Sequence, residues 1–512
     1  MKLHWQVLLS MILAVAAGLL LQSTTAAPST TGATWSAVPG GLQLTAARGP
    51  AAEGGYSVGD MPKLAVGDVI VALIEDRGDP QASRVPLNAP EQVADRVAGM
   101  EPGTALWLER QTGDLVSIKL GLDPGCARAK WIAPFAFIAD IFMSLLKMLI
   151  VPIVLSSIVA GVIGVGAMGN LRRLGTKTFA YYVSTSLIAI LVGQVLVSVI
   201  RPGSGAELGL SEAPAGVEKL SLIEIFTRMV PQNVPKAMIS NGDMLQVIFF
   251  ALLFGTFAIK AGAPHTERLR DLFNSLFSVM LAMAEGILKL LPIGVFALLI
   301  KVVAQTGFSV FEPLLVYMFT VALALVLHCC VTLPTLLKAL GGVSPRRWFR
   351  AMSPALMTAF STSSSSMTLP ITMETVEKRG KVSNKVTSFT LPLGATINMD
   401  GTALYECIGV IFLAQYYATA TGFELTLGVQ AMVVVMALMA SVGAAGIPSA
   451  GLVMMLTILS SIGLPLEGAA LLLAVDRPLD MLRTVTNVWS DSCGAAIIAR
   501  TEGEDGPLTA GD

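Results

Sequence analysis

Long apolar segments follow one another from Cys126 almost to the end of the chain. Charged residues make up only 13% of the sequence, about half the roughly 25% of a soluble domain. A soluble fold would leave large apolar surfaces in water, whereas a bilayer solvates them. We therefore predict an all-α polytopic membrane protein. With a net charge of −1 and no basic stripe, the sequence excludes nucleic-acid binding. The nearly uninterrupted segments are residues 132–168, 179–200, 244–261, 272–303 and 308–340.

The N-terminal hydrophobic run, residues 7–21, is short for a span of about 20 residues. Trp5 and Gln22 flank it and suit the membrane interfaces. We predict that residues 1–27 form the first transmembrane helix. A cleaved signal peptide is the alternative, because Lys2 is basic and residues 25–27 fit a cleavage site.

Residues 38–123 have a different pattern. Short apolar runs alternate with polar residues and are broken by Gly and Pro. A segment of this size can bury its own core. We predict a small α+β domain inserted after the first helix. Its expected strands are residues 68–73, 105–110 and 115–120, and its expected helix is residues 91–99.

The last third of the chain is apolar but interrupted by Ser, Gly, Pro, Asn and Asp. Irregular backbone at membrane depth is tolerated only where it lines a cavity or is buried in protein. We therefore expect the functional site here. Two of the interrupted segments, about 350–376 and 425–464, are predicted to be re-entrant hairpins.

Basic loops set the expected orientation, because cytoplasmic loops are rich in Lys and Arg. Both termini, including a tail at residues 503–512, are then cytoplasmic, and the inserted domain is periplasmic or extracellular. The two hairpins enter from opposite sides, which is typical of an inverted repeat with its site at their meeting point. The four basic loops carry Arg172, Arg173 and Lys177; Lys260, Arg268 and Arg270; Lys338, Arg346, Arg347 and Arg350; and Lys378, Arg379, Lys381 and Lys385.

The last apolar segment carries a narrow polar face within an arc of about 100°. Ionisable groups at membrane depth cost several kcal/mol each unless they pair or line a polar cavity. An internal salt bridge between Asp480 and Arg483, one turn apart, is the alternative, but it accounts for only one pair. The face consists of Asp476, Asp480, Arg483, Thr484, Asn487 and Asp491.

Three further motifs lie in apolar surroundings. Residues 398–402 (Asn-Met-Asp-Gly-Thr) offer hard oxygen ligands for a small cation, or else form a turn between helices. The serines at 363–366 either form a linker or present hydroxyl and N–H groups to a carboxylate at a hairpin tip. Residues 444–451 are small and suit a gate.

These motifs, in this order, resemble the glutamate/aspartate transporter family, the dicarboxylate/amino acid:cation symporters. The resemblance covers the first helix and the membrane domain at about residues 130–502, and residues 394–405 are its most specific part. It implies eight transmembrane helices and two re-entrant hairpins in a homotrimer, with an elevator movement of the transport domain. It implies no enzymatic activity and no cofactor.

The resemblance also implies a role for each matched position. Asp480 would hold the substrate α-amino group, and Arg483 would hold the side-chain carboxylate in bidentate geometry. The other substrate-binding positions are Ser364, Ser365, Thr402, Gly446, Ile447, Thr484 and Asn487.

Three sodium sites follow from the same resemblance. The first uses Asp491 with carbonyl groups of Gly394, Asn398 and Asn487; the second uses Tyr182, Thr185, Ser186, Asn398 and Asp400; the third uses Thr396 with carbonyl groups of Ser441, Val442 and Ala444.

Glu406 matches a position that carries a coupled proton in excitatory amino-acid transporters. Burial favours the uncharged carboxyl group, which suits reversible protonation; a purely structural hydrogen bond is the alternative. Family members usually carry a second arginine at the position of Ser363 or of Met481, and this sequence has neither. Whether Arg477 replaces it stays open at this point, and potassium counter-transport is in doubt.

The inserted domain resembles a bacterial PDZ domain in residues 64–70 and 102–104. That implies binding of an extended peptide or a protein C-terminus by strand addition, and a spacer is the alternative. The resemblance of the membrane domain implies a secondary symporter that takes up glutamate or aspartate, driven by sodium and with Glu406 as the candidate for proton coupling; two other functions compete with it. One is symport of a four-carbon dicarboxylate, although Asp480 would then repel the substrate. The other is a PDZ-dependent membrane sensor or interaction protein.

Overall fold

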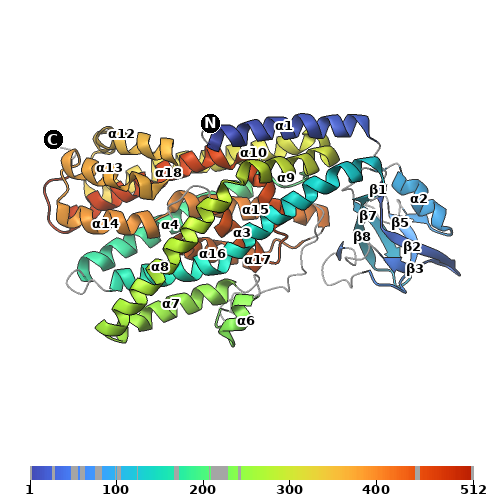
Figure 1. The fold of residues 1–512 in the computed structure, drawn as a ribbon, viewed down its shortest axis with the longest axis horizontal. Coiled ribbons are helices and arrows are strands. Elements are labelled where there is room, and N and C mark those ends of the chain that lie inside the picture. Colours follow the sequence, from blue (N-terminus) through green and yellow to red (C-terminus); the bar gives the residue numbers. More distant parts are fainter. Residues whose placement is uncertain are drawn as a thin grey trace.

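The computed structural model describes residues 3–25, 29–47, 56–57, 64–74, 84–98, 100, 105–123, 125–166, 172–206, 208, 229–239, 244–421, 423–443 and 450–508. Long helices run along the molecule, with a small β-sheet module at one end and the C-terminus at the other (Figure 1). Within these residues, six helical stretches are long and apolar enough to cross a bilayer, in agreement with the predicted membrane class. They are Gln6–Thr24, Ala127–Gly164, Arg173–Ile200, Ala263–Leu288, Gly307–Gly341 and Asn384–Thr419.

The module lies between helices α1 (Leu3–Thr24) and α3 (Ala127–Gly166). The three strands and the helix expected there are present, each to within one residue, and short strands accompany them. Its elements are β1 (Ser29–Thr30), β2 (Ala33–Val38), β3 (Gly41–Ala47), β4 (Tyr56–Ser57), β5 (Val69–Ile74), β6 (Arg84–Pro86), α2 (Pro90–Ala98), β7 (Ala105–Arg110), β8 (Leu115–Lys119) and β9 (Gly121–Leu122).

The strands pair antiparallel in the order β2-β3-β5-β7-β8-β4, and β6 also pairs with β5. One sheet face is buried through Leu42, Ile70, Leu106 and Ile118, as the period-2 alternation of apolar residues requires. Separately, β1 pairs with β9, so that Thr30 lies opposite Gly121. The chain therefore leaves α1 and returns to α3 through one short two-stranded link.

The remaining helices form the body of the molecule. They are α4 (Arg172–Ile200), α6 (Val234–Ile239), α7 (Met244–Lys260), α8 (Ala263–Leu288), α9 (Leu291–Thr306), the 3₁₀ turn η4 (Gly307–Val310), α10 (Phe311–Leu327), the π-helical turn η5 (His328–Thr332), α11 (Leu333–Gly341), α12 (Pro345–Thr362), α13 (Ser365–Lys378), α14 (Asn384–Ile397), α15 (Asp400–Thr421), α16 (Leu427–Gly443), α17 (Ala450–Ser461) and α18 (Glu467–Thr501).

The apolar segment expected at residues 272–303 is two helices rather than one. Helix α8 ends at Leu288, and α9 begins at Leu291 with Pro292 in its first turn. Proline is tolerated in the first turn because the N–H it lacks would have no partner there. Hydropathy alone does not reveal this break, because both sides of it are apolar.

Two breaks among the described C-terminal helices fall where polar residues interrupt the apolar sequence. Helices α12 and α13 meet at Ser363, whose backbone is left-handed (φ 53°), and the Ser364 hydroxyl caps α13 by accepting from Met367 N. Between α14 and α15, Asn398 leaves the helical conformation (φ −102°, ψ 85°). Helices α16 and α17 flank residues 444–449, which lie outside the described part of the chain.

Helix packing divides the body into two groups. Helix α1 packs on α9, and α3 packs on α7, α8 and α9. Helix α18 packs on α10 to α15, and α15 packs on α4.

At the end of α18, Lys177 of α4 donates to Glu502 Oε1 at 2.5 Å, and this hydrogen bond holds the pKa of Glu502 below its usual value. Thus α4 belongs with the group that carries the predicted site.

Candidate functional site

Arg483 is the centre of the polar face of α18. Its side chain is only 1% exposed, and Nη2 donates to Asp480 Oδ1 at 2.6 Å and to Asp476 Oδ1 at 3.1 Å. The guanidinium carbon lies 3.9 Å from the centre of the Tyr405 ring on α15. The flat face is thus stacked on an aromatic ring, which leaves the edges of the guanidinium for hydrogen bonds.

Two donors of Arg483, Nε and Nη1, are buried without a hydrogen-bond partner among the described residues. A Cβ atom on Gly451, near the start of α17, would come within 2.5 Å of Nη1. Buried donors without a partner are rare and costly. These two donors can therefore take an anionic acceptor such as a carboxylate, and Gly451 leaves room beside Nη1.

Glu406 follows Tyr405 on α15 and is fully buried. Neither carboxyl oxygen has a hydrogen-bond partner in the described structure. A charged carboxylate in such surroundings pays a large desolvation cost, whereas a neutral carboxyl group pays much less. The alternative role, a structural hydrogen bond, has no contact to support it within the described residues.

The serine tip between α12 and α13 is buried. Ser364 and Ser365 are 2% and 5% exposed and form the N-terminus of α13, which packs on α18. Helix N-termini carry free N–H groups and favour anions. Gly446 and Ile447, the predicted residues of the opposing tip, lie outside the described residues.

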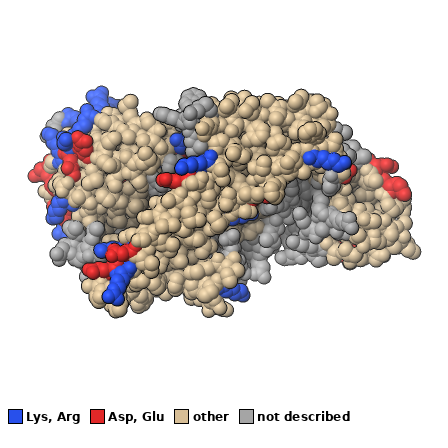
Figure 2. Space-filling model, in the orientation of Figure 1, with Lys and Arg blue, Asp and Glu red and all other residues tan. Residues whose placement is uncertain are grey.

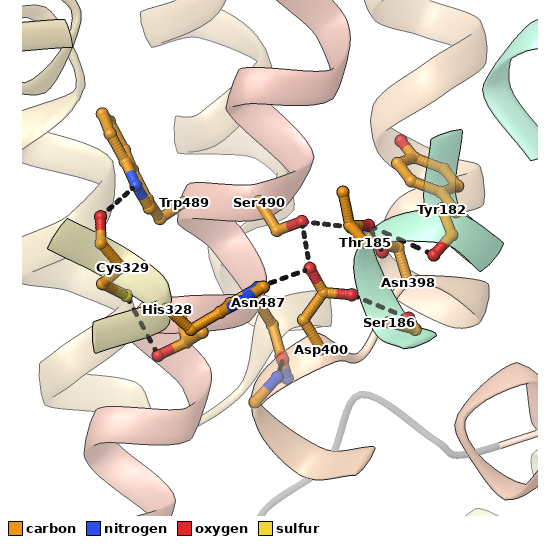
Figure 3. Close-up of polar contacts among 12 residues, drawn as sticks. Tyr182, Thr185, Ser186, His328, Cys329, Asn398, Asp400, Asn487, Trp489 and Ser490 are labelled. Atoms are coloured by element: carbon orange, nitrogen blue, oxygen red, sulfur yellow. Dashed lines mark hydrogen bonds and ion pairs between the residues drawn. The ribbon is translucent and has the colours of Figure 1, made fainter. Parts of the chain in front are cut away.

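Asp400, the first residue of α15, lies in a second polar cluster that is completely buried (Figure 3). Its carboxylate accepts from Ser186 Oγ of α4 at 2.7 Å and from Ser490 Oγ of α18 at 2.6 Å. His328 Nε2 lies 3.1 Å from Asp400 Oδ2. Three helices far apart in sequence thus place polar groups around one carboxylate.

Asn398 connects this cluster to Asp491. Its amide nitrogen donates to Asp491 Oδ1 at 2.8 Å and to Ser490 Oγ at 3.0 Å, while its oxygen accepts from Thr185 at 3.4 Å. The α14–α15 break makes these contacts possible, because it turns the Asn398 side chain toward α18. Gly394 leaves room for the Asp491 carboxylate and the Tyr182 hydroxyl, which a Cβ atom would meet.

Asn487 and Thr402 are also brought together, whereas Thr484 and Tyr182 bond to backbone carbonyl groups. Asn487 accepts from Gly401 N at 2.8 Å and donates to Thr402 Oγ1 at 3.2 Å. Thr484 donates to its own helix at Asp480 O, at 2.8 Å. Tyr182 donates to Thr390 O at 2.8 Å.

The residues of the third predicted sodium site are not seen to converge. Thr396 is exposed, and its hydroxyl donates to Leu393 O within α14 at 2.9 Å. The Ser441 hydroxyl likewise bonds within α16, to Leu438 O at 2.8 Å. Val442 has no described side chain, and Ala444 lies outside the described residues.

Several contacts of the site were not predicted from the sequence, among them those of Ser490 with Asp400 and Asn398. Asp476 shares the guanidinium of Arg483 with Asp480, and its position on the polar face of α18 could have indicated this contact. His328 contacts Asp400 from the π-helical turn between α10 and α11, and an ionisable residue inside an apolar segment was a signal for it. Arg477 also approaches the site, with Nη1 3.4 Å from Asp480 Oδ2.

A family model described as the sodium:dicarboxylate symporter family matches residues 112–501. The chain belongs to this family. Residues 1–111, which include α1 and most of the β-sheet module, lie outside the match. The expectation of a transporter rather than an enzyme is therefore supported by a match to a family of symporters.

Relatives of known function support the same assignment. The chain is 35% identical to the proton/glutamate-aspartate symporter of Escherichia coli, over 71% of this chain and 84% of that protein. It is 34% identical to the proton/sodium-glutamate symport protein of Geobacillus stearothermophilus, over 72% and 87%. It is 32% identical to mouse excitatory amino acid transporter 3, over 72% and 79%.

Proposed function

We propose that this membrane protein is a symporter that takes up glutamate and aspartate, driven by sodium ions. The observation that carries the substrate class is the buried guanidinium of Arg483, whose Nε and Nη1 have no partner among the described residues and can donate charge-assisted hydrogen bonds to a carboxylate. Asp480 supplies the carboxylate that an ammonium group requires. The relatives named for glutamate and aspartate transport support the same choice.

Charge argues against the competing dicarboxylate. Two buried carboxylates, Asp476 and Asp480, flank the buried guanidinium of Arg483. A substrate without an amino group would place its second carboxylate near them without compensation, whereas an acidic amino acid brings an ammonium group. A neutral amino acid has no side-chain carboxylate and would leave Nε and Nη1 of Arg483 without an acceptor.

Uptake by the purified full chain in proteoliposomes tests this function. Radiolabelled aspartate or glutamate is expected to accumulate under an inward sodium gradient and not under a potassium gradient. Unlabelled glutamate should compete, and succinate should compete at least about 100-fold less well, because sites built for a polar group reject analogues that lack it. Sodium-driven succinate uptake that survives Asp480→Asn would contradict the amino-acid assignment.

For the topology, we propose eight transmembrane helices: α1, α3, α4, α7, α8–α9, α10–α11, α14–α15 and α18. The pairs α12–α13 and α16–α17 are the two re-entrant hairpins, at about residues 350–376 and 425–464. The ends of α12 and α13 and the C-terminus face the cytoplasm of the inner membrane. Lys and Arg gather at this end of the molecule in the view of Figure 2, as the positive-inside rule predicts.

The assembly is a homotrimer in which the group around α18 moves relative to the group of α1, α3, α7, α8 and α9. The division of helix packing described above supports this elevator movement. Two sodium sites are proposed, one at Asp400 with Thr185, Ser186 and Asn398, and one at Asp491. The contacts among these residues support them, whereas the third predicted site has no such support.

Replacing Glu406 with glutamine is expected to make aspartate uptake independent of external pH, because an amide cannot carry the coupled proton. Uptake by the unmodified chain should rise as the external pH falls at constant sodium. The measurement is initial uptake against external pH in proteoliposomes. Glu502→Gln is the matched control, since that carboxylate lies beyond the end of α18 and should leave the pH profile unchanged. Equal profiles for both variants would contradict the role of Glu406.

The module at residues 38–123 is proposed to be a periplasmic PDZ-like domain that binds a peptide or a protein C-terminus. Strand β2 is an edge strand and α2 contacts it, so a peptide strand can add beside that helix. The β1–β9 link gives a clean deletion: residues 31–120 are removed and Thr30 is joined to Gly121 by a short glycine linker. Unchanged uptake would leave the module an accessory role, whereas loss of uptake in a correctly folded protein would favour the sensor alternative.

A further inference from the structure

A groove with a volume of about 860 Å³ opens on the side of α18 that faces away from Asp480 and Arg483. Its walls come from α10, the π-helical turn, α11, the first turns of α12, and α18. This volume falls in the range of about 300–1,000 Å³ that is usual for ligand sites. The apolar walls include Leu325, Val326, Phe349, Leu482, Val485 and Trp489.

One end of the groove is basic. Lys338, Arg346 and Arg350 line it, all three are exposed, and no acidic residue occurs among the lining residues. Their side chains have no carboxylate partner among the described salt bridges. This end therefore presents three cations to whatever enters the groove, with nothing in the lining to neutralise them.

Charge and apolar surface are separated along the groove. From Lys338 back to Leu325 the chain covers 13 helical positions, or about 20 Å along the helix axis. One leaflet of the hydrocarbon core is about 15 Å deep. The groove thus has a basic end at one membrane surface and an apolar end near the middle of the bilayer, which is the layout of an amphiphile with an anionic head.

We propose that this groove binds one anionic phospholipid of the cytoplasmic leaflet. The phosphate lies among Lys338, Arg346 and Arg350, and an acyl chain extends between α10 and α18 past Val326 and Val485. Basic pockets between transmembrane helices on the cytoplasmic side suit anionic head groups in this way. The choice of leaflet rests on the orientation given with the proposed function.

The groove is lined by the two elements that carry the polar clusters of the site, α18 and the π-helical turn. Its floor contains Cys329, Thr486 and Trp489. Cys329 donates to Thr486 Oγ1 at 3.2 Å, and Trp489 Nε1 donates to the Cys329 carbonyl at 3.1 Å (Figure 3). These bonds connect α18 to the turn that carries His328. A bound acyl chain therefore packs on the two elements that hold Arg483 and the Asp400 contact.

Photolabelling of the full chain in nanodiscs tests the proposal. The discs contain phosphatidylcholine and a small fraction of phosphatidylglycerol that carries a photoreactive group near the end of one acyl chain. Labelled peptides should contain residues of the groove floor. The same photoreactive chain on phosphatidylcholine should label them about tenfold less, since each nearby basic residue favours an anionic lipid by a fewfold factor.

Two variants and one control make the test specific. Arg346→Gln with Arg350→Gln should lower labelling by phosphatidylglycerol about tenfold. Val326→Trp should also lower it by blocking the apolar part; this side chain is 50% exposed, so the larger residue does not disturb the core. Arg268→Gln with Arg270→Gln removes the same charge from α8, outside the groove, and should leave labelling unchanged.

Equal labelling by the two lipids, or labelling unaffected by the arginine variant, would show an ordinary boundary lipid and overturn the proposal. Displacement of the lipid by millimolar glycerol phosphate would also overturn it, because the site would then serve a soluble phosphate. Thermal unfolding of each variant checks that it is folded. Photolabelling does not require transport. The lipid proposal can therefore fail while sodium-driven uptake is observed, and uptake can fail while labelling is observed.

Discussion

Replacing Arg483 with alanine is expected to abolish sodium-driven aspartate uptake, with a loss of about 100-fold or more in kcat/KM. The substitution removes the charge-assisted hydrogen bonds that Nε and Nη1 donate to the substrate carboxylate. It also leaves Asp476 and Asp480 buried without their shared cation, which costs about 3–5 kcal/mol. The measurement is initial uptake against aspartate concentration in proteoliposomes. Arg483→Lys should recover only part of the activity, because a compact ammonium group cannot stack on Tyr405 and also reach both aspartates and the substrate.

Arg477→Ala is the matched control on the same helix. Arg477 also approaches Asp480, but at 3.4 Å and with a side chain that is 27% exposed. Solvent weakens such a contact, so we expect a loss of less than about tenfold. Aspartate-induced thermal stabilisation separates binding from folding: Arg483→Ala should lose it and keep stabilisation by sodium. A severe defect in Arg477→Ala with normal uptake by Arg483→Ala would assign the substrate carboxylate to Arg477 instead.

The sequence predicted the elements whose pattern is local. The strand at Val69–Ile74 is a short, β-branched apolar run after Asp68, and the helix break at Asn398 follows from polar residues inside an apolar run. The break at Lys289 was not predicted, although Lys289 and Pro292 interrupt the leucines there. Residue spacing shows which side chains share a helix face, but one lysine or proline inside an apolar run does not fix where a helix ends.

The site itself depends on contacts that are distant in sequence. The polar face of α18 follows from helical spacing, and the resemblance added the residues on other helices. Neither indicated that His328 would contact Asp400, 72 positions away, because that contact depends on how the π-helical turn faces α15. Likewise, spacing placed Asp476 on the right face but not on the guanidinium of Arg483, since a long side chain can reach several neighbours.

Replacing Asp400 with asparagine is expected to raise the sodium concentration for half-maximal aspartate uptake by about tenfold or more. The carboxylate is 0% exposed and supplies the negative charge of its cluster, and a neutral amide gives a sodium ion only a dipole. A tenfold change corresponds to about 1.4 kcal/mol of lost sodium binding. The measurement is uptake at saturating aspartate over a range of sodium concentrations, with choline as the replacing cation.

His328→Gln tests whether sodium binding depends on the charge of Asp400 or on the hydrogen bonds that its neighbours make with it. Glutamine can still donate a hydrogen bond toward Asp400 Oδ2, so the carboxylate stays in place and the sodium dependence should shift by less than about threefold. His328→Ala removes that donor while Ser186 and Ser490 remain, and its shift should lie between those of His328→Gln and Asp400→Asn. If Asp400→Asn leaves the sodium dependence unchanged while Asp491→Asn alters it, the cation belongs at Asp491 alone, and the cluster around Asp400 only joins α4, α15 and α18.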